Sequence, residues 1–124
     1  MSAYPAHVLE HYRAPRNRRG VPDATHGHTV SNPLCGDEVT VRLRVAGGAV
    51  ADAGWGGVGC AVAVAAASLL TEHVRGRPAG EVAAMGRDEA LALVDAPLNP
   101  ARTRCASLAW EAVRGALAAD AGDK

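Results

Sequence analysis

The sequence predicts an α+β domain, in which a small antiparallel sheet of two to three strands carries helices packed on one face. Residues 38–45 alternate between apolar and polar side chains, which is the pattern of a strand with one buried and one wet face. Ala46-Gly47-Gly48 then makes a tight turn that returns the chain as a partner strand. The rest of the chain has helical spacing, and no repeat or low-complexity linker interrupts it. Strands followed by helices are typical of this class, so we expect a single domain over residues 1–124.

The N-terminal part of the chain is predicted to be a helix followed by a loop. Apolar residues recur at helical spacing over Pro5 to Arg13, and a proline suits the first turn of a helix. The segment 14–20 contains Pro, Asn and Gly and ends this helix. We expect a loop from there to Leu34, with a short strand around Thr25 to Val30.

The central strands and the later helices follow from the same periodicities. The main strand covers Glu38 to Val45, and Ala49 to Trp55 forms its partner. Residues 56–59 are predicted to be a flexible glycine loop. The helices are expected at 61–74, at 81–94 in one or two pieces that Gly86 would separate, and at about 105–119, after a loop at 97–100.

Charge and hydropathy narrow the classes of function. Lys+Arg and Asp+Glu each number 13, so the formal net charge is zero and nothing favours nucleic acid or an acidic lipid surface. The longest uncharged apolar run, Cys60 to Leu70, is far shorter than the roughly 20 residues that span a bilayer. The charged opening residues do not form a signal peptide. We therefore expect a cytoplasmic protein that binds neither nucleic acid nor membrane.

Three cysteines carry the most chemical information. Cys35 lies in a turn that leads into the first long strand, while Cys60 and Cys105 are each expected to open a helix. Unpaired backbone N–H groups and the positive end of the helix dipole favour a thiolate over a thiol at such a position. Arg102 and Arg104 add positive charge beside Cys105. In a reducing compartment, well-spaced cysteines of this kind indicate metal ligands or nucleophiles rather than disulfides.

A carboxylate completes a set of four ligands. Asp37 is two residues from Cys35, so on a turn or bulge both side chains reach one point. Three thiolates and one carboxylate, from Cys35, Asp37, Cys60 and Cys105, suit tetrahedral Zn²⁺ or iron bridged by sulfide. The oxygen ligand is harder and more easily displaced than a thiolate, which suits a site that must release or exchange something.

Four segments together resemble a known family. They are NPLCGD at 32–37, GVGC at 57–60 before an Ala/Ser-rich helix, RTRCASLAW at 102–110, and the opening segment 4–17. In this order they are similar to the IscU/NifU-N-terminal/SufU family, whose members assemble iron–sulfur clusters. The resemblance covers essentially the whole chain and implies a SufE/NifU-like fold.

Two branches of that family differ at positions that this sequence displays. The IscU-like scaffolds carry His before the last Cys and a Leu-Pro-Pro-Val-Lys segment ahead of it, whereas this chain has Arg104 and lacks that segment at 97–102. The SufU-like branch has a basic residue and a Cys-Ala-x-Leu-x-Trp run there, as at Arg104 and 105–110. The spacing between Cys60 and Cys105 is short, as in the scaffolds. The local chemistry around the last Cys therefore favours the SufU-like branch.

The resemblance implies two functions for the four ligands. In the first, the protein is a zinc-dependent sulfurtransferase: Cys105, beside Arg102 and Arg104, leaves the Zn²⁺ and accepts sulfane sulfur from a cysteine desulfurase. In the second, the same ligands hold a transient [2Fe–2S] cluster on a non-enzymatic scaffold, which passes it to apo iron–sulfur proteins or to downstream assembly factors. A third hypothesis is a zinc-stabilised interaction domain without sulfur chemistry. The displaceable Asp37 ligand and the glycine loop argue against it.

Other conspicuous residues are interpreted as less specific. None of the five histidines is adjacent to a cysteine, so each is expected to be solvated or hydrogen-bonded. They are His7, His11, His26, His28 and His73. The basic run Arg13, Arg16, Arg18 and Arg19 indicates a solvated loop, with docking of a partner as the alternative. Trp55 and Trp110 are expected in the core. Gly57 and Gly59 would serve the turn and would let the loop move Cys60 toward and away from the metal.

Overall fold

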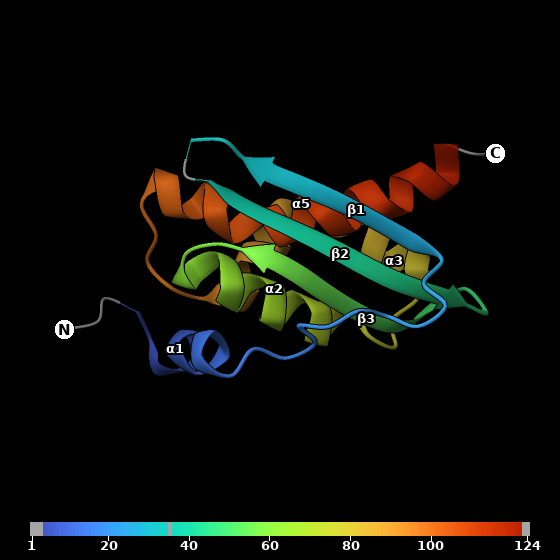
Figure 1. Ribbon diagram of the computed structural model, residues 1–124, viewed down its shortest axis with the longest axis horizontal. Helices are drawn as coiled ribbons and strands as arrows, with labels where there is room; N and C mark the ends of the chain where they lie inside the picture. The colour runs from blue at the N-terminus through green and yellow to red at the C-terminus, as the bar shows by residue number, and fades with distance from the viewer. Residues whose placement is uncertain (1–3, 35, 123–124) are drawn as a thin grey trace.

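The computed structural model describes residues 4–34 and 36–122, with side chains described through residue 118. Within these ranges the elements run in the order α1 (Ala6–Arg13), β1 (His26–Asn32), β2 (Asp37–Ala46), β3 (Ala49–Val58), α2 (Ala61–Val74), α3 (Ala79–Ala83), α4 (Arg87–Val94) and α5 (Pro100–Gly122). Figure 1 shows the strands as one sheet with helices behind it. The predicted α+β class is confirmed.

The sheet in the described part of the chain has three antiparallel strands in the order β1-β2-β3. The predicted alternation holds along β2, where Val39, Val41 and Leu43 are buried and Arg42 is exposed. In the register, Val41 lies opposite His28 of β1 and Trp55 of β3. One face of the sheet therefore supplies apolar side chains to the core, and the other remains polar.

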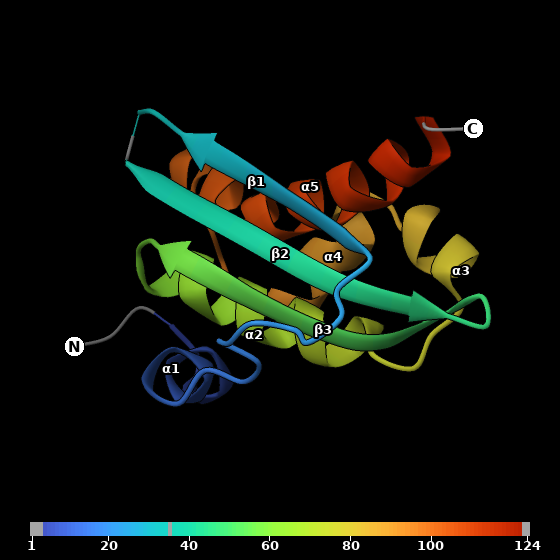
Figure 2. The same ribbon diagram turned by 45° about the vertical axis from the view of Figure 1, so that its right-hand side comes forward.

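The helices cover the apolar face of the sheet. Figure 2 shows α2, α4 and α5 on the same side of the strands, with α1 beside α2. Small side chains allow α2 and α5 to approach closely, because Ala67, Ala112 and Ala116 are fully buried. Leu43 and Val113 fill the space between the sheet and α5. Within the described residues, no helix is long and apolar enough to cross a membrane.

The two tryptophans occupy different depths. Trp55 is buried, as predicted, and its indole N–H donates a hydrogen bond of 2.9 Å to the carbonyl of Arg16. Trp110 packs against the core but is only partly buried, and its indole N–H donates to the carbonyl of Met85 at 2.9 Å. Each indole thus finds an acceptor for its one polar group.

The basic run after α1 is tied to the rest of the fold. The Arg16 guanidinium pairs with Glu10 at 2.9 Å, and that of Arg19 pairs with Asp52 of β3 at 2.9 Å. Arg18 lies over the Trp55 ring, 4.9 Å from its centroid. The segment therefore lies along β3 (Figure 1), and its arginines stay exposed or partly exposed to solvent, as predicted, while Arg16, Arg18 and Arg19 also bond to other parts of the fold.

Two helix boundaries can be compared directly with the boundaries predicted from the sequence. Gly86 precedes α4 as its N-cap, so the break expected within 81–94 is confirmed. The last helix, however, begins at Pro100 rather than near Cys105. The Asn99 side chain accepts a hydrogen bond of 2.8 Å from the Arg102 N–H, and Pro100 occupies the first turn, where its missing N–H costs nothing. The predicted loop at 97–100 was therefore in part a helix start.

A buried histidine joins α1 to α2. The His11 Nδ1 lies 2.7 Å from the Ser68 hydroxyl, which also accepts a hydrogen bond of 2.8 Å from the Arg16 N–H. Burial, and next the positive charge of Arg16, lower the pKa of His11, while Glu72 and Glu10 oppose this shift. The fold therefore favours the neutral imidazole.

We expect the free energy of unfolding to fall as the pH is lowered. A histidine whose pKa is lower in the folded state than in the unfolded state contributes stability above its unfolded pKa, and this contribution is lost as the pH falls through the folded pKa. Chemical denaturation between pH 7.5 and 5 measures the effect. The variant His11→Gln should flatten the dependence; an unchanged slope would exclude His11 as a source. Burial also lowers the pKa of His73, so His73 is a second source of the same pH dependence. The same denaturation series on His73→Gln measures its share.

Candidate metal centre

Three of the predicted ligands meet at one end of the sheet. Asp37 is the first residue of β2, Cys60 immediately precedes α2, and Cys105 lies on α5. One ligand atom from each of them lies within 4.8 Å of the other two. Residues separated by 23 and 45 positions are thus brought to a single point, where a carboxylate and two sulfurs converge.

The Asp37 carboxylate is buried without a full set of partners. Its Oδ2 atom is buried and forms no hydrogen bond with the described residues. A buried carboxylate oxygen without a partner is costly, and such an atom in a native fold calls for a ligand that completes it. The donor set of one oxygen and two sulfurs suits Zn²⁺ or iron. The described residues therefore fit a metal ion.

Cys60 lies in the connection between the end of β3 and the start of α2. It is the N-cap residue of α2, as predicted, and its carbonyl accepts the first helical hydrogen bond, 3.0 Å from the Val64 nitrogen. The preceding residue, Gly59, lies against Asp37, because a Cβ on it would be 3.5 Å from the Asp37 Oδ2 and 2.8 Å from the Ala63 methyl. A glycine at 59 therefore lets the chain pass between the carboxylate and α2.

The expected glycine loop is shorter than predicted. β3 extends to Val58, so Gly56 and Gly57 are part of the strand, and only Gly59 and Cys60 connect it to α2. Gly57 pairs with Val39, has a φ of +127°, and would place a Cβ against the carbonyl oxygen of Glu38. The prediction that Gly57 belongs to a flexible loop that swings Cys60 is therefore wrong.

Cys105 does not open a helix. Because α5 begins at Pro100, Cys105 lies in the second turn, away from the unpaired N–H groups of the helix start. Its side chain is 3% exposed. The argument that the helix N-terminus activates this thiol is therefore wrong, although Cys105 does lie in the predicted cluster.

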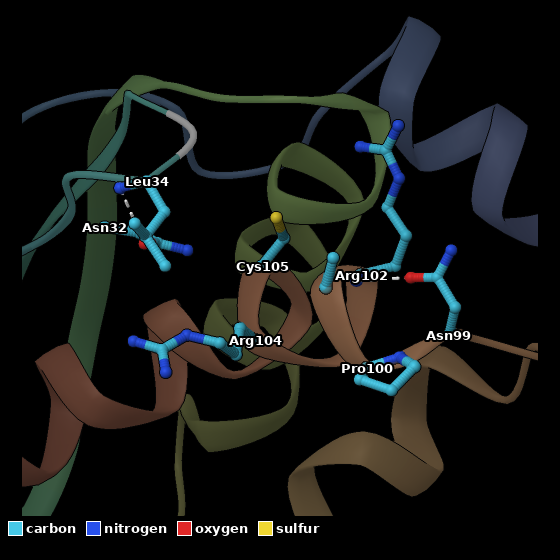
Figure 3. A pocket seen from close by; sticks show the side chains of 8 residues that line it. Asn32, Leu34, Asn99, Pro100, Arg102, Arg104 and Cys105 are labelled. Atoms are coloured by element: carbon cyan, nitrogen blue, oxygen red, sulfur yellow. Dashed lines mark hydrogen bonds between the residues drawn. The ribbon is translucent and has the colours of Figure 1, made fainter.

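The two arginines beside Cys105 lie differently from each other. A hydrogen bond to Cys60 is the largest of the interactions that raise the pKa of Arg102, and Cys105 is a weaker contributor. Arg102 therefore interacts more strongly with Cys60 than with Cys105, which is closer to it in the sequence. Figure 3 shows Cys105 between Arg102 and Arg104, whose side chains extend in different directions.

A cavity of about 500 Å³ opens beside these residues. Its walls come from the end of β1, the turn that follows it and the start of α5, and they are formed by Asn32, Leu34, Asn99, Pro100, Ala101, Arg102, Arg104 and Cys105. The Leu34 N–H donates to the Asn32 side chain at 3.2 Å, which shapes the turn (Figure 3). Leu34 is 85% exposed, so the rim of the cavity is apolar and open to a partner. Asn32 and Leu34 belong to the NPLCGD segment that carries the resemblance, but neither was predicted to be a site residue.

The remaining candidate residues are Cys35 and the histidines. Cys35 lies outside the described residues, and its ligand role stays a prediction. The Gly36 N–H donates a hydrogen bond of 2.9 Å to the Asn32 carbonyl. The histidines do not join the cluster of Asp37, Cys60 and Cys105 in the described ranges. His7 donates to the Val94 carbonyl at 2.6 Å, and His28 lies against Gly115 of α5. The hydrogen bond of His7 and the exposure of His28 agree with the prediction of solvated or hydrogen-bonded histidines.

Comparison with protein families identifies the chain. The sequence model of the NifU-like N-terminal domain matches residues 3–122. The chain belongs to this family. The NifU-like N-terminal domain thus accounts for nearly all of the sequence, including the segments that carry Asp37, Cys60 and Cys105.

Curated relatives of this NifU-like domain have two kinds of name. The zinc-dependent sulfurtransferase SufU of Bacillus subtilis is 29% identical over an alignment 132 residues long, gaps included, which covers 93% of this chain and 89% of SufU. The iron–sulfur cluster assembly scaffold protein IscU 1 of Archaeoglobus fulgidus is 34% identical over 114 residues, which cover 92% and 74% of the two chains. Both branches considered from the sequence are therefore represented.

Solved structures support the fold of the NifU-like domain. The FiSufU protein of Fervidobacterium islandicum AW-1 superposes with a TM-score of 0.78 at 21% identity, covering 93% of this chain and 96% of that chain. The N-terminal NifU-like protein of Brucella abortus gives a TM-score of 0.75 at 23% identity, with 98% and 96% covered. At these identities the likeness concerns the fold.

Proposed function

We propose that this NifU-like domain acts in iron–sulfur cluster assembly as a zinc-binding sulfur acceptor for a cysteine desulfurase. The observation that carries the proposal is the convergence of Asp37, Cys60 and Cys105, whose ligand atoms lie within 4.8 Å of one another. The sequence relationship to a zinc-dependent sulfurtransferase supports zinc as the metal. We take residues 1–124 as one domain that works in a reducing compartment such as the cytoplasm, where cysteine ligands stay reduced.

The metal would be held by Cys35, Asp37, Cys60 and Cys105. Bound Zn²⁺ would keep thiols deprotonated at neutral pH and so make them available as nucleophiles. The Asp37 carboxylate is the weakest donor of the set for a soft metal, so it is the ligand best suited to give way. The Arg102 guanidinium, whose pKa is raised by its interaction with Cys60, would offset part of the negative charge of the ligands.

The sulfur step is a thiolate–persulfide exchange. The Cys105 thiolate attacks the outer sulfur of the desulfurase persulfide, the S–S bond of the donor breaks, and the donor cysteine leaves as a thiolate. The product is a persulfide on Cys105, and no external oxidant or reductant takes part. Cys105 lines the open cavity beside Leu34 and Arg104, which supports access by a donor group from a partner.

A scaffold function is the second candidate. The A. fulgidus IscU relative is 34% identical, and the short interval between Cys60 and Cys105 also resembles the scaffolds. In this function the same four ligands hold a [2Fe–2S] cluster, which passes to apo acceptor proteins. In protein purified under aerobic conditions, a brown chromophore supports the scaffold. Colourless protein with one zinc supports sulfur acceptance only together with stimulation of a desulfurase, because zinc can also occupy the empty site of a scaffold.

The decisive experiment maps the sulfur. After incubation with a cysteine desulfurase and cysteine, mass spectrometry of the wild-type protein should find the added sulfur atom on the peptide that contains Cys105. Cys105→Ser should reduce stimulation of desulfurase turnover by at least about tenfold, because a serine hydroxyl is not ionised near neutral pH.

The matched variants Cys60→Ser and Cys35→Ser separate loss of metal from loss of the acceptor. All three substitutions remove a ligand, but only the acceptor variant should lack the persulfide peptide when each is assayed at saturating zinc. A persulfide on Cys60 or Cys35, with Cys105 unmodified, would contradict the assignment of Cys105.

A further inference from the structure

A buried asparagine lies at the bottom of the cavity together with Cys105. Of the eight described residues that line this cavity, Asn32 and Cys105 are buried, with 4% and 3% of their surfaces exposed, and the other six are exposed. The wall around them is in large part apolar, because Leu34, Pro100 and Ala101 contribute to it. Asn32 therefore places an amide group beside the thiol at the closed end of the cavity.

The strand pairing explains why the Asn32 side chain lies there. Asn32 is the last residue of β1 and pairs with Asp37, the first residue of β2. Residues directly opposite each other on antiparallel strands project their side chains from the same face of the sheet. Asp37 is buried on that face, and one of its carboxylate oxygens lies within 4.8 Å of the Cys105 sulfur. The sheet therefore directs Asn32 and Asp37 toward the same helix, α5, on which Cys105 lies.

A backbone contact determines which end of the Asn32 amide faces the cavity. The Leu34 N–H donates a hydrogen bond of 3.2 Å to the Oδ1 atom of Asn32. A side-chain amide has one oxygen, which accepts, and one nitrogen, which has two N–H donors. Because the oxygen is bound to the turn, the nitrogen points away from it, and Figure 3 shows the nitrogen directed toward the side on which Cys105 lies. Asn32 thus presents hydrogen-bond donors to the cavity.

A sulfur atom added to Cys105 would need such a donor. The outer sulfur of a persulfide is a stronger acid than a thiol and is therefore anionic near neutral pH. An anion beside apolar walls is costly unless hydrogen bonds stabilise it. The neighbouring arginines are less suited to this task, because Arg102 interacts more strongly with Cys60 than with Cys105, and Arg104 is exposed.

We propose that Asn32 binds the sulfur that Cys105 accepts, through a hydrogen bond from its side-chain amide to the outer sulfur of the Cys105 persulfide. This role rests on the sulfur-acceptor function proposed above and identifies a group that recognises the transferred sulfur. Hydrogen bonds to a charged acceptor are roughly twice as strong as those between neutral groups. The amide therefore favours the anionic persulfide over an uncharged mixed disulfide of the same cysteine.

The first test observes the amide directly. The chain has three asparagines, Asn17, Asn32 and Asn99, and no glutamine, so NMR spectra contain only three side-chain amide groups. The zinc-loaded full chain is equilibrated with glutathione and glutathione persulfide. The Cys105 thiolate attacks the outer sulfur of the glutathione persulfide, the S–S bond breaks, and glutathione leaves as a thiolate. We expect the Asn32 amide signals to shift as the persulfide forms, and those of Asn17 and Asn99 to stay in place.

The second test separates the donor from the turn. Asn32→Asp removes the N–H donors but keeps an oxygen that can accept the hydrogen bond from the Leu34 N–H. Mass spectrometry at equilibrium with the same glutathione mixture gives the ratio of persulfide to thiol on the Cys105 peptide. We expect Asn32→Asp to lower this ratio by at least about tenfold, the effect of one hydrogen bond to a charged group.

Asn99→Asp is the matched control for the added charge. Asn99 lines the same cavity on the other side of Cys105 (Figure 3), and an aspartate there can still accept the hydrogen bond from the Arg102 N–H. Because residue 99 is exposed, the new charge is screened by solvent, and the persulfide ratio should change by less than about twofold.

The outcomes distinguish the role of Asn32 from the function on which it rests. A Cys105 persulfide that forms from the glutathione mixture but not with a desulfurase would contradict the sulfur-acceptor function, while the same two measurements would still decide the role of Asn32. Unshifted Asn32 amide signals in the persulfidated wild type, or an unchanged ratio in Asn32→Asp, would overturn that role. Should Asn32→Asp fail to fold, the wild-type amide signals decide alone. Cys105 left unmodified by either donor would overturn both.

Discussion

Asp37→Ala should lower the affinity for zinc by at least about 100-fold while leaving the metal-free protein more stable than the wild type. The substitution removes the only oxygen donor of the proposed ligand set. It also removes a buried oxygen that has no hydrogen-bond partner among the described residues. Relieving that cost should raise the free energy of unfolding of the metal-free protein by about 1 kcal/mol.

Competition with a chelator measures the first effect, and denaturation of the metal-free protein measures the second. Glu38→Ala is the control, because it removes the carboxylate of the next residue, which is exposed and accepts a hydrogen bond from Ser31. If the metal-free Asp37→Ala protein were less stable than the wild type, Asp37 would have a structural role instead of a ligand role.

Asp37→Cys tests whether sulfur transfer requires a weakly bound oxygen donor at this position. A fourth thiolate should hold zinc more firmly than the carboxylate does. If the site must open during sulfur transfer, this variant should retain zinc longer against a chelator and stimulate the desulfurase less. Full stimulation, together with full cluster transfer to an apo acceptor, would exclude the idea of a displaceable ligand.

Gly57→Ala should destabilise the protein by about 3 kcal/mol, which corresponds to a fall in Tm of roughly 12 °C for a domain of this size. The residue has a φ of +127°, which side chains rarely adopt. Its Cβ would also meet the Glu38 carbonyl, one residue after Asp37. The substitution would therefore disturb the β2–β3 pairing next to the proposed ligands.

Gly56→Ala is the matched control for this effect. Gly56 precedes Gly57 in the same strand, has no positive φ, and has open space where a Cβ would lie. Its stability should change by less than about 0.5 kcal/mol. Equal losses in the two variants would attribute the effect to any side chain in this strand and not to the backbone of residue 57.

Local patterns predicted most of the fold. The alternation at Val39, Val41 and Leu43 predicted the central strand and its buried face, since strand periodicity depends only on neighbouring residues. The start of the last helix was misplaced because Asn99 and Pro100 were taken for loop residues, although Asn before Pro is also a helix-start signal. Gly57 was misassigned because a glycine signals a turn and a tight strand pairing equally well.

The candidate site was predictable in its membership but not in its contacts. Cysteine chemistry and the proximity of Asp37 to Cys35 in the sequence identified the donors, and the fold brings three of them together. The interaction of Arg102 with Cys60, which raises the pKa of Arg102, was not predictable, because these residues are distant in sequence and meet only through the packing of α5 against α2.

The short connection between β3 and α2 limits how this protein can vary in length. Val58 is the last residue of the strand and Cys60 the cap of the helix, so the sheet itself determines where this sulfur lies. A single inserted residue would displace it by about 3.3 Å, whereas a metal site tolerates about 0.2 Å. Insertions and deletions should therefore be excluded at residues 58–60, while the exposed Gly47-Gly48 turn at the far end of the same strand should accept them.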